Sequence, residues 1–468
     1  MRSSLTGLQR WIPGATVVNN ATMPVESVQF DGVSTDSRNV AAGNLFVALR
    51  GERFDAHEYL NDVAAKGVVA VVVERVPEGL RVPALVVPDT RVALGEIARH
   101  WRQQFSFPVI GVTGSNGKTT VKEMIASILA AAFGEDYLAT RGNLNNDIGV
   151  PLTLFRLDAS CKGAVIELGM NHPGEIAALA AIAQPTVGLV NNAQREHQEF
   201  MESVEAVAKE NGAVIAGLPP DGVAVFPADD PFTPLWRAYT GKRKAMTFGL
   251  SADAEVTCTY IANDFGSDLT MTAGTQRFDV KLSAAGVHNV RNALAATACT
   301  LAIGISPDAV KRGLEAFAPV SGRLQRKVAR SGALVIDDTY NANPDSVRAA
   351  IDVLSHGHAP RVLVLGDMGE VGNDGPKFHE EIGAYARERG IEHLLALGEL
   401  ARHSTAAFGP QARHFDDISA LNQAVEALVA KDATALVKGS RFMKMERVVQ
   451  HIVDPANKQT TQQIQESH

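Results

Sequence analysis

The chain has 468 residues, of which 46% are apolar, and 44 Lys and Arg against 52 Asp and Glu give it a net charge of −8. This length is typical of about three domains of ~150 residues, the apolar fraction argues against disorder, and the acidic balance argues against a nucleic-acid partner. The cysteines, Cys161, Cys258 and Cys299, form no CxxC pair, so neither a zinc site nor a disulfide framework is predicted. The N-terminal residues lack the apolar segment of a signal peptide, and the longest apolar run, residues 67–76, is too short to span a bilayer. We therefore expect a cytoplasmic protein with no membrane insertion.

Residues 1–106 are predicted to form a first, small α/β domain. Apolar, β-branched runs at 44–49, 68–73 and 84–87 are bounded by Gly and Pro and indicate strands. The segment 91–105 has the spacing of apolar residues that is typical of a helix.

Residues 107–323 alternate apolar strands with helical patterns. A strand over 108–112 is followed by a Gly-rich turn and a helix from Lys118, and strands follow at 163–168, 186–190 and 222–226. This alternation favours a mainly parallel sheet with helices on both faces. The stretch 254–283 alternates apolar and polar residues, which predicts antiparallel strands, and a helix is expected over about 289–302.

Residues 324–455 repeat the α/β rhythm, and the polar residues 456–468 are predicted to be a tail. Strands are expected at 333–337, 361–366, 393–397 and 434–439. The fold class is therefore predicted as α/β in three domains, with a mainly parallel sheet in the central one.

Residues 111–120, GVTGSNGKTT, have the composition of a phosphate-binding loop but not its usual spacing, because Gly111, Gly114 and Gly117 stand three apart. A strand, a Gly-rich turn and a helix N-terminus occur in the order that anion binding needs. Lys118 supplies a charge for the phosphates, and the hydroxyl of Thr119 is a ligand type for Mg²⁺. The alternative is a Gly-rich turn that only begins a helix. A Rossmann dinucleotide site is disfavoured because G-x-G-x-x-G is missing.

Two further residues are expected at the same sheet edge as this loop. Glu167 ends the strand at 163–168, and His197 lies on the loop after the strand at 186–190. The carboxyl ends of parallel strands meet at the ligand-binding edge, so both are candidates for a metal or phosphate site. A solvated carboxylate and a surface histidine are the alternatives.

These motifs together resemble the Mur ligases, the ATP-dependent amide-forming enzymes of peptidoglycan synthesis. The resemblance rests on GVTGSNGKTT, ELGMNHPGEI, HNVRNALAA, SGRLQ and DDTYNANPDSVRAA, and it covers nearly the whole chain. The stretches STDSRNVAAGNLFVALRGERFDAHEYL, RGNLNNDIGVPLTL, LGDMGEVG and KGSRFMKMERVV are most similar to the members that join D-alanyl-D-alanine to a UDP-N-acetylmuramoyl tripeptide. The resemblance implies a UDP-sugar domain, a central ATPase and a C-terminal Rossmann-like domain. It also implies ATP and Mg²⁺ as cofactors and an acyl-phosphate route, and we expect a monomer.

The resemblance assigns roles to residues that match the family's motifs. Lys118, Glu167 and His197 would be catalytic, and Thr119, Glu167 and His197 would hold metal. The implied ATP-binding residues are Thr113, Gly114, Ser115, Asn116, Gly117, Lys118, Thr119, Thr120, Asn292, Arg323, Asp338, Tyr340 and Asn341. The implied substrate-binding residues are Thr35, Asp36, Ser37 and Arg38 for the UDP-sugar, Asn145 and Asn146 for the tripeptide, and Lys438 and Ser440 for the dipeptide.

Two of these motifs can also be explained without a ligand. His288, Asn289 and Asn292 fit the family's G-x-H-N-x-x-N pattern, but Asn289 could simply cap a helix and Asn292 could be solvated. The segment DDTYNANPD could be a polar turn after a strand.

Three other functions are compatible with parts of this pattern. Another Mur ligase that adds a different amino acid, or folylpolyglutamate synthase, shares single motifs with the chain. A nucleotide-binding switch without ligase chemistry would need no acceptor pocket. The sequence does not say whether the third residue of the tripeptide is diaminopimelate or lysine.

One position departs from the family. Many Mur ligases carry a carbamylated lysine fourteen residues after the conserved histidine, and that position here is Asn211. Lys209 lies two residues earlier, about 200° away around a helix. We therefore predict no carbamate, an unmodified and solvated Lys209, and a neutral carbonyl oxygen from Asn211 toward the second metal.

Overall fold

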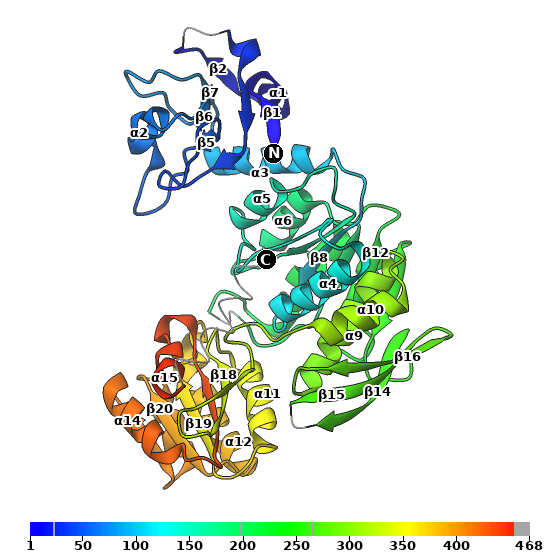
Figure 1. Ribbon diagram of the computed structural model, residues 1–468, viewed down its shortest axis with the longest axis vertical. Helices are drawn as coiled ribbons and strands as arrows, with labels where there is room; N and C mark the ends of the chain where they lie inside the picture. Colours follow the sequence, from blue (N-terminus) through cyan, green and yellow to red (C-terminus); the bar gives the residue numbers. More distant parts are fainter. Residues whose placement is uncertain (22–23, 197–198, 264, 454–468) are drawn as a thin grey trace.

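The computed structural model describes residues 1–21, 24–196, 199–263 and 265–453. The chain forms three α/β units that follow one another along the long axis of the molecule (Figure 1). This confirms the predicted three-domain α/β class, while the limits at 106, 323 and 455 stay predictions. No helix among the described residues is long and apolar enough to cross a membrane.

The first unit is built on a five-stranded sheet in the order β2-β7-β6-β5-β4, in which only β2 runs antiparallel to its neighbour. Its strands are β2 (Thr16–Val18), β4 (Val33–Ser34), β5 (Leu45–Val47), β6 (Ala70–Val73) and β7 (Ala84–Val86), beside a small antiparallel pair of β1 (Arg2–Ser4) and β3 (Gln29–Asp31). Its helices are α1 (Leu5–Trp11), α2 (Leu60–Ala65) and α3 (Thr90–Arg102). The predicted strands at 44–49, 68–73 and 84–87 are β5, β6 and β7, and the predicted helix is α3.

The central unit has a nine-stranded sheet in the order β16-β15-β14-β13-β12-β11-β8-β10-β9. Its strands are β8 (Val109–Thr113), β9 (Tyr137–Ala139), β10 (Gly163–Glu167), β11 (Val187–Val190), β12 (Val223–Pro227), β13 (Lys244–Phe248), β14 (Val256–Asn263), β15 (Gly266–Ala273) and β16 (Gln276–Leu282). The strands from β9 to β14 pair in parallel, and β14, β15 and β16 are antiparallel, as the alternation over 254–283 predicted.

Helices cover both faces of this sheet, as expected for a parallel sheet with buried strands. They are α4 (Lys118–Phe133), α5 (Gly149–Leu154), α6 (Glu175–Ala183), α7 (Val204–Ala216), α8 (Thr233–Thr240), α9 (Val287–Ala302) and α10 (Pro307–Ala316). One core joins α4, α9 and α10 to the sheet. The other core joins α6 and α7 to α1 and α3, so the first two units share a continuous apolar interior.

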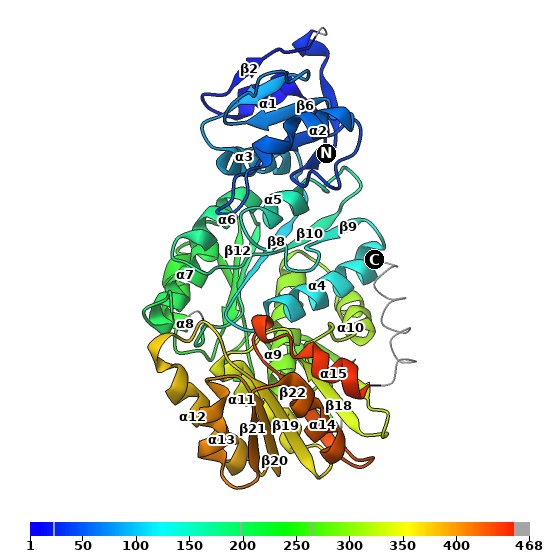
Figure 2. The ribbon, with the colours of Figure 1, turned by 90° about the vertical axis from the view of Figure 1, so that its left-hand side faces the viewer.

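The third unit has a six-stranded sheet in the order β17-β18-β22-β19-β20-β21, in which only β17 is antiparallel. Its strands are β17 (Gln325–Val328), β18 (Leu334–Asp338), β19 (Arg361–Gly366), β20 (His393–Leu397), β21 (Ala412–Phe415) and β22 (Thr434–Lys438). Its helices are α11 (Pro344–Ser355), α12 (Gly375–Glu388), α13 (Ala401–Phe408), α14 (Ile418–Leu428) and α15 (Glu446–Ile452). Figure 2 shows α11 and α12 on one face of this sheet and α14 and α15 on the other.

Candidate active site

A large cleft of about 1390 Å³ lies where the central and third units meet. Its central wall is formed by the turn between β8 and α4 and by the ends of β10 and β11. Its other wall is formed by the segment after β18 and by the end of β22. In the central sheet Glu167 pairs with Val112, and Val190 pairs with Thr113, so the carboxyl ends of β8, β10 and β11 meet at one edge. This is the edge at which open α/β sheets bind ligands.

The glycines of the β8–α4 turn are required by its backbone. Gly114 and Gly117 have φ of +135° and +81°, which side chains rarely adopt. A Cβ at Gly114 would lie 2.9 Å from Cβ of Asn191, and one at Gly117 would lie 2.5 Å from Oδ1 of Asn292. Helix α4 begins at Lys118 without a side-chain cap on its N-terminal N–H groups. The turn therefore leaves backbone donors at a positive helix end, which is the geometry of an anion site.

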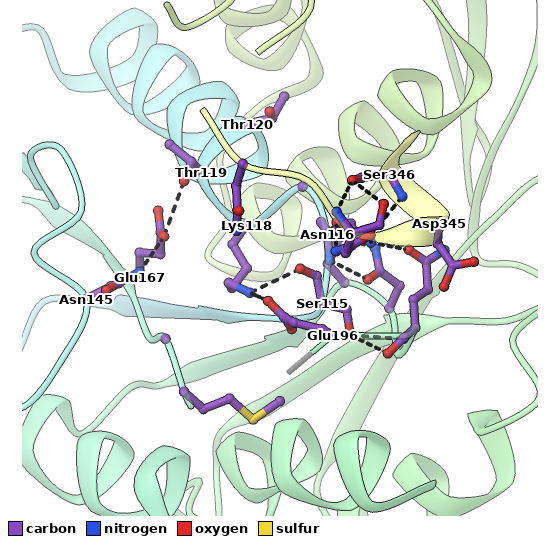
Figure 3. A pocket seen from close by; sticks show the side chains of 18 of the residues that line it. Ser115, Asn116, Lys118, Thr119, Thr120, Asn145, Glu167, Glu196, Asp345 and Ser346 are labelled. Atoms are coloured by element: carbon purple, nitrogen blue, oxygen red, sulfur yellow. Dashed lines mark hydrogen bonds and ion pairs between the residues drawn. The ribbon is translucent and has the colours of Figure 1, made fainter. Parts of the chain in front are cut away.

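Lys118 is held by an internal carboxylate. Its ammonium lies 2.7 Å from Oε1 of Glu196 and also donates to the carbonyl oxygens of Gly114 and Ser115 (Figure 3). Both side chains of the Lys118–Glu196 pair are mostly buried, with 15% and 12% exposed. A phosphate that enters the turn would compete with Glu196 for this lysine.

Glu167 and Thr119 form the second polar group of the cleft. Thr119 Oγ1 donates to Glu167 Oε1 over 3.2 Å, and Asn145 Nδ2 donates to the same oxygen over 2.9 Å. Among the described residues, no partner reaches the other carboxylate oxygen, Oε2, although it is buried. A buried, unpaired anionic oxygen beside a hydroxyl suits a hard divalent cation, which typically takes one or two carboxylates and completes its shell with water and substrate phosphates. The residues present therefore fit Mg²⁺. His197 lies outside the described residues.

Three asparagines are linked on the other side of the turn. Asn191 Nδ2 donates to Asn292 Oδ1 over 3.0 Å and to the carbonyl oxygen of Asn116 over 2.8 Å. Asn292 Nδ2 donates to Asn289 Oδ1 over 3.0 Å. Asn292 is buried, which contradicts the alternative that it is solvated. Asn289 is not the N-cap of α9, because Gly286 holds that position and the side chain of Asn289 donates to the carbonyl oxygen of Ala285.

Arg323, at the join to the third unit, lies next to the pair of Thr119 and Glu167. Arg323 Nη2 donates to Thr119 Oγ1 over 2.9 Å, and its guanidinium carbon lies 4.2 Å from the centre of the Tyr340 ring. Asp338, at the end of β18, accepts from Lys438 of β22 over 2.6 Å and from the backbone N–H of Leu324 over 3.1 Å. The predicted nucleotide residues of the third unit thus line the same cleft as the phosphate turn.

Lys438 and Ser440, predicted on the dipeptide side, use their polar groups within the third unit. Lys438 also donates to the carbonyl oxygen of Asn341 over 2.9 Å. Ser440 Oγ donates to the carbonyl oxygen of Ala342 over 3.1 Å and accepts from the backbone N–H of Gly369 over 2.7 Å. Both side chains are buried, so this geometry favours a supporting role over direct contact with an acceptor.

The segment between β11 and α7 links the phosphate turn to the third unit. Asn116 Nδ2 donates to Gln194 Oε1 over 2.6 Å, and Asn343 Nδ2 donates to Asn116 Oδ1 over 2.9 Å. Arg195, next along this segment, forms ion pairs with Asp345 of α11 at 2.6 Å and with Glu381 of α12 at 2.8 Å. The sequence did not indicate Arg195, Glu196, Asp345 or Glu381, because their ion pairs join residues far apart in the chain.

Comparison with known proteins identifies the family. Family models match three stretches: the Mur ligase family catalytic domain at residues 29–102, the Mur ligase middle domain at 112–300, and the Mur ligase glutamate ligase domain at 322–441. The UDP-N-acetylmuramoyl-tripeptide–D-alanyl-D-alanine ligase of Escherichia coli K12 is 42% identical over 438 residues, which are 93% of this chain and 96% of that protein. The chain belongs to the Mur ligase family.

Further Mur ligases match over nearly their full length. The ligase of the same name from Bacillus subtilis 168 is 34% identical over 92% of this chain and 94% of that protein. A crystal structure of MurF from Acinetobacter baumannii superposes with a TM-score of 0.90 at 34% identity, covering 96% of this chain and 98% of that one. The MurF ligase of Thermotoga maritima in complex with ADP has a TM-score of 0.81 at 27% identity, covering 90% and 96%.

The residues that the Mur ligase resemblance assigned to the UDP-sugar do not line this cleft. Asp36 accepts hydrogen bonds from the backbone and guanidinium of Arg38 at 2.9 Å, and these bonds lower the pKa of Asp36 to about 2. The carbonyl oxygen of Ser37 accepts from Lys66 over 2.7 Å. Together with Thr35 they form a separate turn of the first unit, in which Arg38 is exposed and the other three residues are half-buried. Asn146, assigned to the tripeptide, does line the cleft, and its Oδ1 accepts from the backbone N–H of Gly149 at the start of α5 over 2.8 Å.

The position of the family's modified lysine is occupied by a buried asparagine, Asn211. Lys209 is exposed and paired with Glu205 at 2.7 Å, in agreement with a solvated helix residue. Asn211 is buried, but its carbonyl oxygen Oδ1 accepts from the backbone N–H of Gly114 over 3.0 Å. The expected contact of this oxygen with a second metal stays a prediction, and the structure gives the same oxygen a hydrogen bond within the phosphate turn.

Proposed function

We propose that this Mur ligase uses ATP to join D-alanyl-D-alanine to a UDP-N-acetylmuramoyl tripeptide, a step of peptidoglycan precursor synthesis. Similarity over nearly the full length to relatives that carry this activity in their names is the observation that carries the proposal. The cleft between the central and third units supplies a phosphate turn on one wall and an acceptor-side wall opposite. We place the reaction in the cytoplasm and take the enzyme as a monomer.

The reaction needs an activated carboxylate, because a free carboxylate is a poor electrophile. In the proposed route the tripeptide's terminal carboxylate attacks the γ-phosphorus of ATP, ADP leaves, and an acyl phosphate forms. The amine of the dipeptide then attacks the acyl carbon, phosphate leaves, and the amine loses a proton as the amide forms. The chain's contribution is positioning and charge, as in other phosphoryl transfers.

Named residues divide this work. Lys118 and the N-terminal N–H groups of α4 would bind the β- and γ-phosphates once Lys118 is released from Glu196. Thr119 and Glu167 would hold Mg²⁺, which when bound offsets the negative charge that two approaching anions bring together. Arg323, which bonds Thr119 from the join, would add a second positive charge at the same place.

Closure of the third unit on the central unit would protect the acyl phosphate from water. Asn343 contacts the phosphate turn at Asn116, and Asp345 and Glu381 contact Arg195 on the segment beside it. A site enclosed in this way excludes competing hydrolysis.

An ADP-release assay with a panel of substrates tests the function. We expect release only with UDP-muramoyl tripeptide and D-Ala-D-Ala together, and tripeptides with diaminopimelate and with lysine identify the preferred donor. Preference for D-Ala alone, for an L-amino acid, or for folate with glutamate would assign another ligase activity. Slow hydrolysis that no amine accelerates would favour a nucleotide switch instead.

A further inference from the structure

The third unit's wall of the cleft carries two cations among the described residues, and they differ in what they already bind. Lys438 is buried in its pair with Asp338. Arg441, three residues later, keeps 66% of its side chain exposed and meets Glu446 at 3.3 Å. An exposed ion pair of this kind is weak, so Arg441 can exchange Glu446 for another carboxylate. If Lys438 left this pair, the buried carboxylate of Asp338 would lose its cation, which is costly.

Arg441 and Arg323 both lie near the ring of Tyr340. The guanidinium carbon of Arg441 is 5.9 Å from the centre of the Tyr340 ring, and that of Arg323 is 4.2 Å from the same centre. Arg323 in turn bonds Thr119 at the start of α4. An extended dipeptide spans about 7 Å, which is longer than either guanidinium-to-ring distance.

We propose that Arg441 binds the terminal carboxylate of the dipeptide acceptor and makes the enzyme select acceptors that end in a free carboxylate. This inference rests on the proposed function and names the acceptor contact within it. A planar guanidinium offers two parallel N–H groups to one carboxylate, so it fixes the direction of the dipeptide as well as its charge. With the carboxylate at Arg441, the free amine at the other end points toward the phosphate side, where the acyl carbon would lie.

The test compares D-Ala-D-Ala with its C-terminal amide, which keeps the amine and both methyl groups but lacks the negative charge. In the wild-type enzyme we expect kcat/KM for the amide to be lower by on the order of 10- to 100-fold, the size of a lost charge-assisted hydrogen bond. Wild-type enzyme that uses both acceptors equally well would overturn the proposal, and this measurement needs no variant.

Variants then assign the preference to one residue. We expect Arg441→Gln to raise the KM for D-Ala-D-Ala by a similar factor and to use dipeptide and amide alike, with the KM for ATP and for the UDP-tripeptide changed less than about twofold. Arg441→Lys should restore part of the preference. Arg402→Gln is the matched control, because Arg402 is also exposed in the third unit but pairs with Asp416 away from the cleft.

Two outcomes separate this inference from the function beneath it. An Arg441→Gln enzyme that still prefers the free carboxylate by the wild-type factor overturns the role of Arg441 and leaves the ligase function standing. A wild-type chain without dipeptide-dependent ADP release overturns the function, and the acceptor contact falls with it.

Discussion

Arg195 of the central unit and Asp345 of the third unit form a two-pronged ion pair across their join. Arg195 Nη2 lies 2.6 Å from Asp345 Oδ1, and the backbone N–H of Arg195 donates to Oδ2 over 2.9 Å. The same guanidinium reaches Glu381, and its hydrogen bonds are the main cause of the lowered pKa of that carboxyl group. Because Glu196 follows Arg195 directly and binds Lys118, one short segment contacts both the phosphate turn and the third unit.

Arg195→Ala is expected to loosen the join. The change removes the central unit's cation that binds two carboxylates of the third unit, Asp345 and Glu381, so the attraction across the join is weakened. We expect a larger radius of gyration in small-angle scattering of the ligand-free variant, and a smaller difference from the wild type when a nonhydrolysable ATP analogue and the UDP-substrate are added. Raising the salt concentration to about 1 M should expand the wild type and not the variant, because screening weakens the same ion pairs. Identical radii for both proteins under all conditions would contradict the closing role of Arg195.

Lys118→Ala is expected to abolish ligase activity and to leave the fold intact. Loss of a charge aimed at the transferred phosphoryl group costs on the order of 10²-fold or more in kcat. The lysine lies at the cleft and not in an apolar core, so circular dichroism should show a retained fold. The melting temperature should fall, because Glu196 loses the cation of a mostly buried pair. Lys162→Ala, which removes a surface lysine paired with Asp136, is the control. Activity within a few-fold of the wild type would remove the phosphate turn from the proposed site.

Asn211→Ala is expected to weaken nucleotide binding. The buried N–H of Gly114 loses its acceptor, at a cost of about 1–3 kcal/mol that disorders the phosphate turn. The KM for ATP should rise, and Lys209→Ala should leave it unchanged because Lys209 pairs with Glu205 on the surface. Added bicarbonate should not raise the activity of the wild type. A bicarbonate-dependent enzyme, or a carbamate seen on Lys209 in an electron-density map, would refute this account of the helix.

The folded protein is expected to lose stability in mild acid because of His288. Desolvation lowers the pKa of His288 to about 4, with smaller contributions from Asp338, Lys438 and Asp352. The unfolded chain therefore binds more protons than the folded chain between pH 6.5 and 4, so the contribution of His288 to stability is present above pH 6.5 and is lost as the pH falls toward 4. Melting temperatures of the wild type and His288→Gln should converge or cross over this window. His358→Gln is a control at an exposed histidine, and a pH-independent difference for His288→Gln would refute the shift.

The sequence predicted local features of the site better than its long-range contacts. The glycines, Lys118 and Thr119 are one continuous stretch, and Glu167 follows from its place at the end of a buried strand. Glu196 could not be predicted to bind Lys118, because that contact spans 78 positions and depends on how two loops meet at one sheet edge. The same holds for Arg195 and Asp345, 150 positions apart.

Two polar residues show a further limit of pattern-based assignment. The family resemblance assigned Lys438 to the dipeptide. In the fold a neighbouring strand places Asp338 beside its ammonium group. The family resemblance led us to expect a metal near Asn211, and the packing of α7 against β8 also turns its amide to the phosphate turn, a contact that the sequence did not indicate. The partner of a polar side chain is decided by tertiary packing that no local pattern contains.

The place of β22 in the third sheet has a consequence for biosynthesis of the chain. This last strand, β22 (Thr434–Lys438), lies between β18 (Leu334–Asp338) and β19 (Arg361–Gly366) in the sheet. Both neighbours are synthesised well before β22, so each has an unpaired edge until the ribosome completes the protein. A chain that stops before Thr434 would carry two apolar strands with unpaired edges, which are hazards for aggregation. Late nonsense mutations in this protein should therefore yield insoluble products and not merely inactive ones.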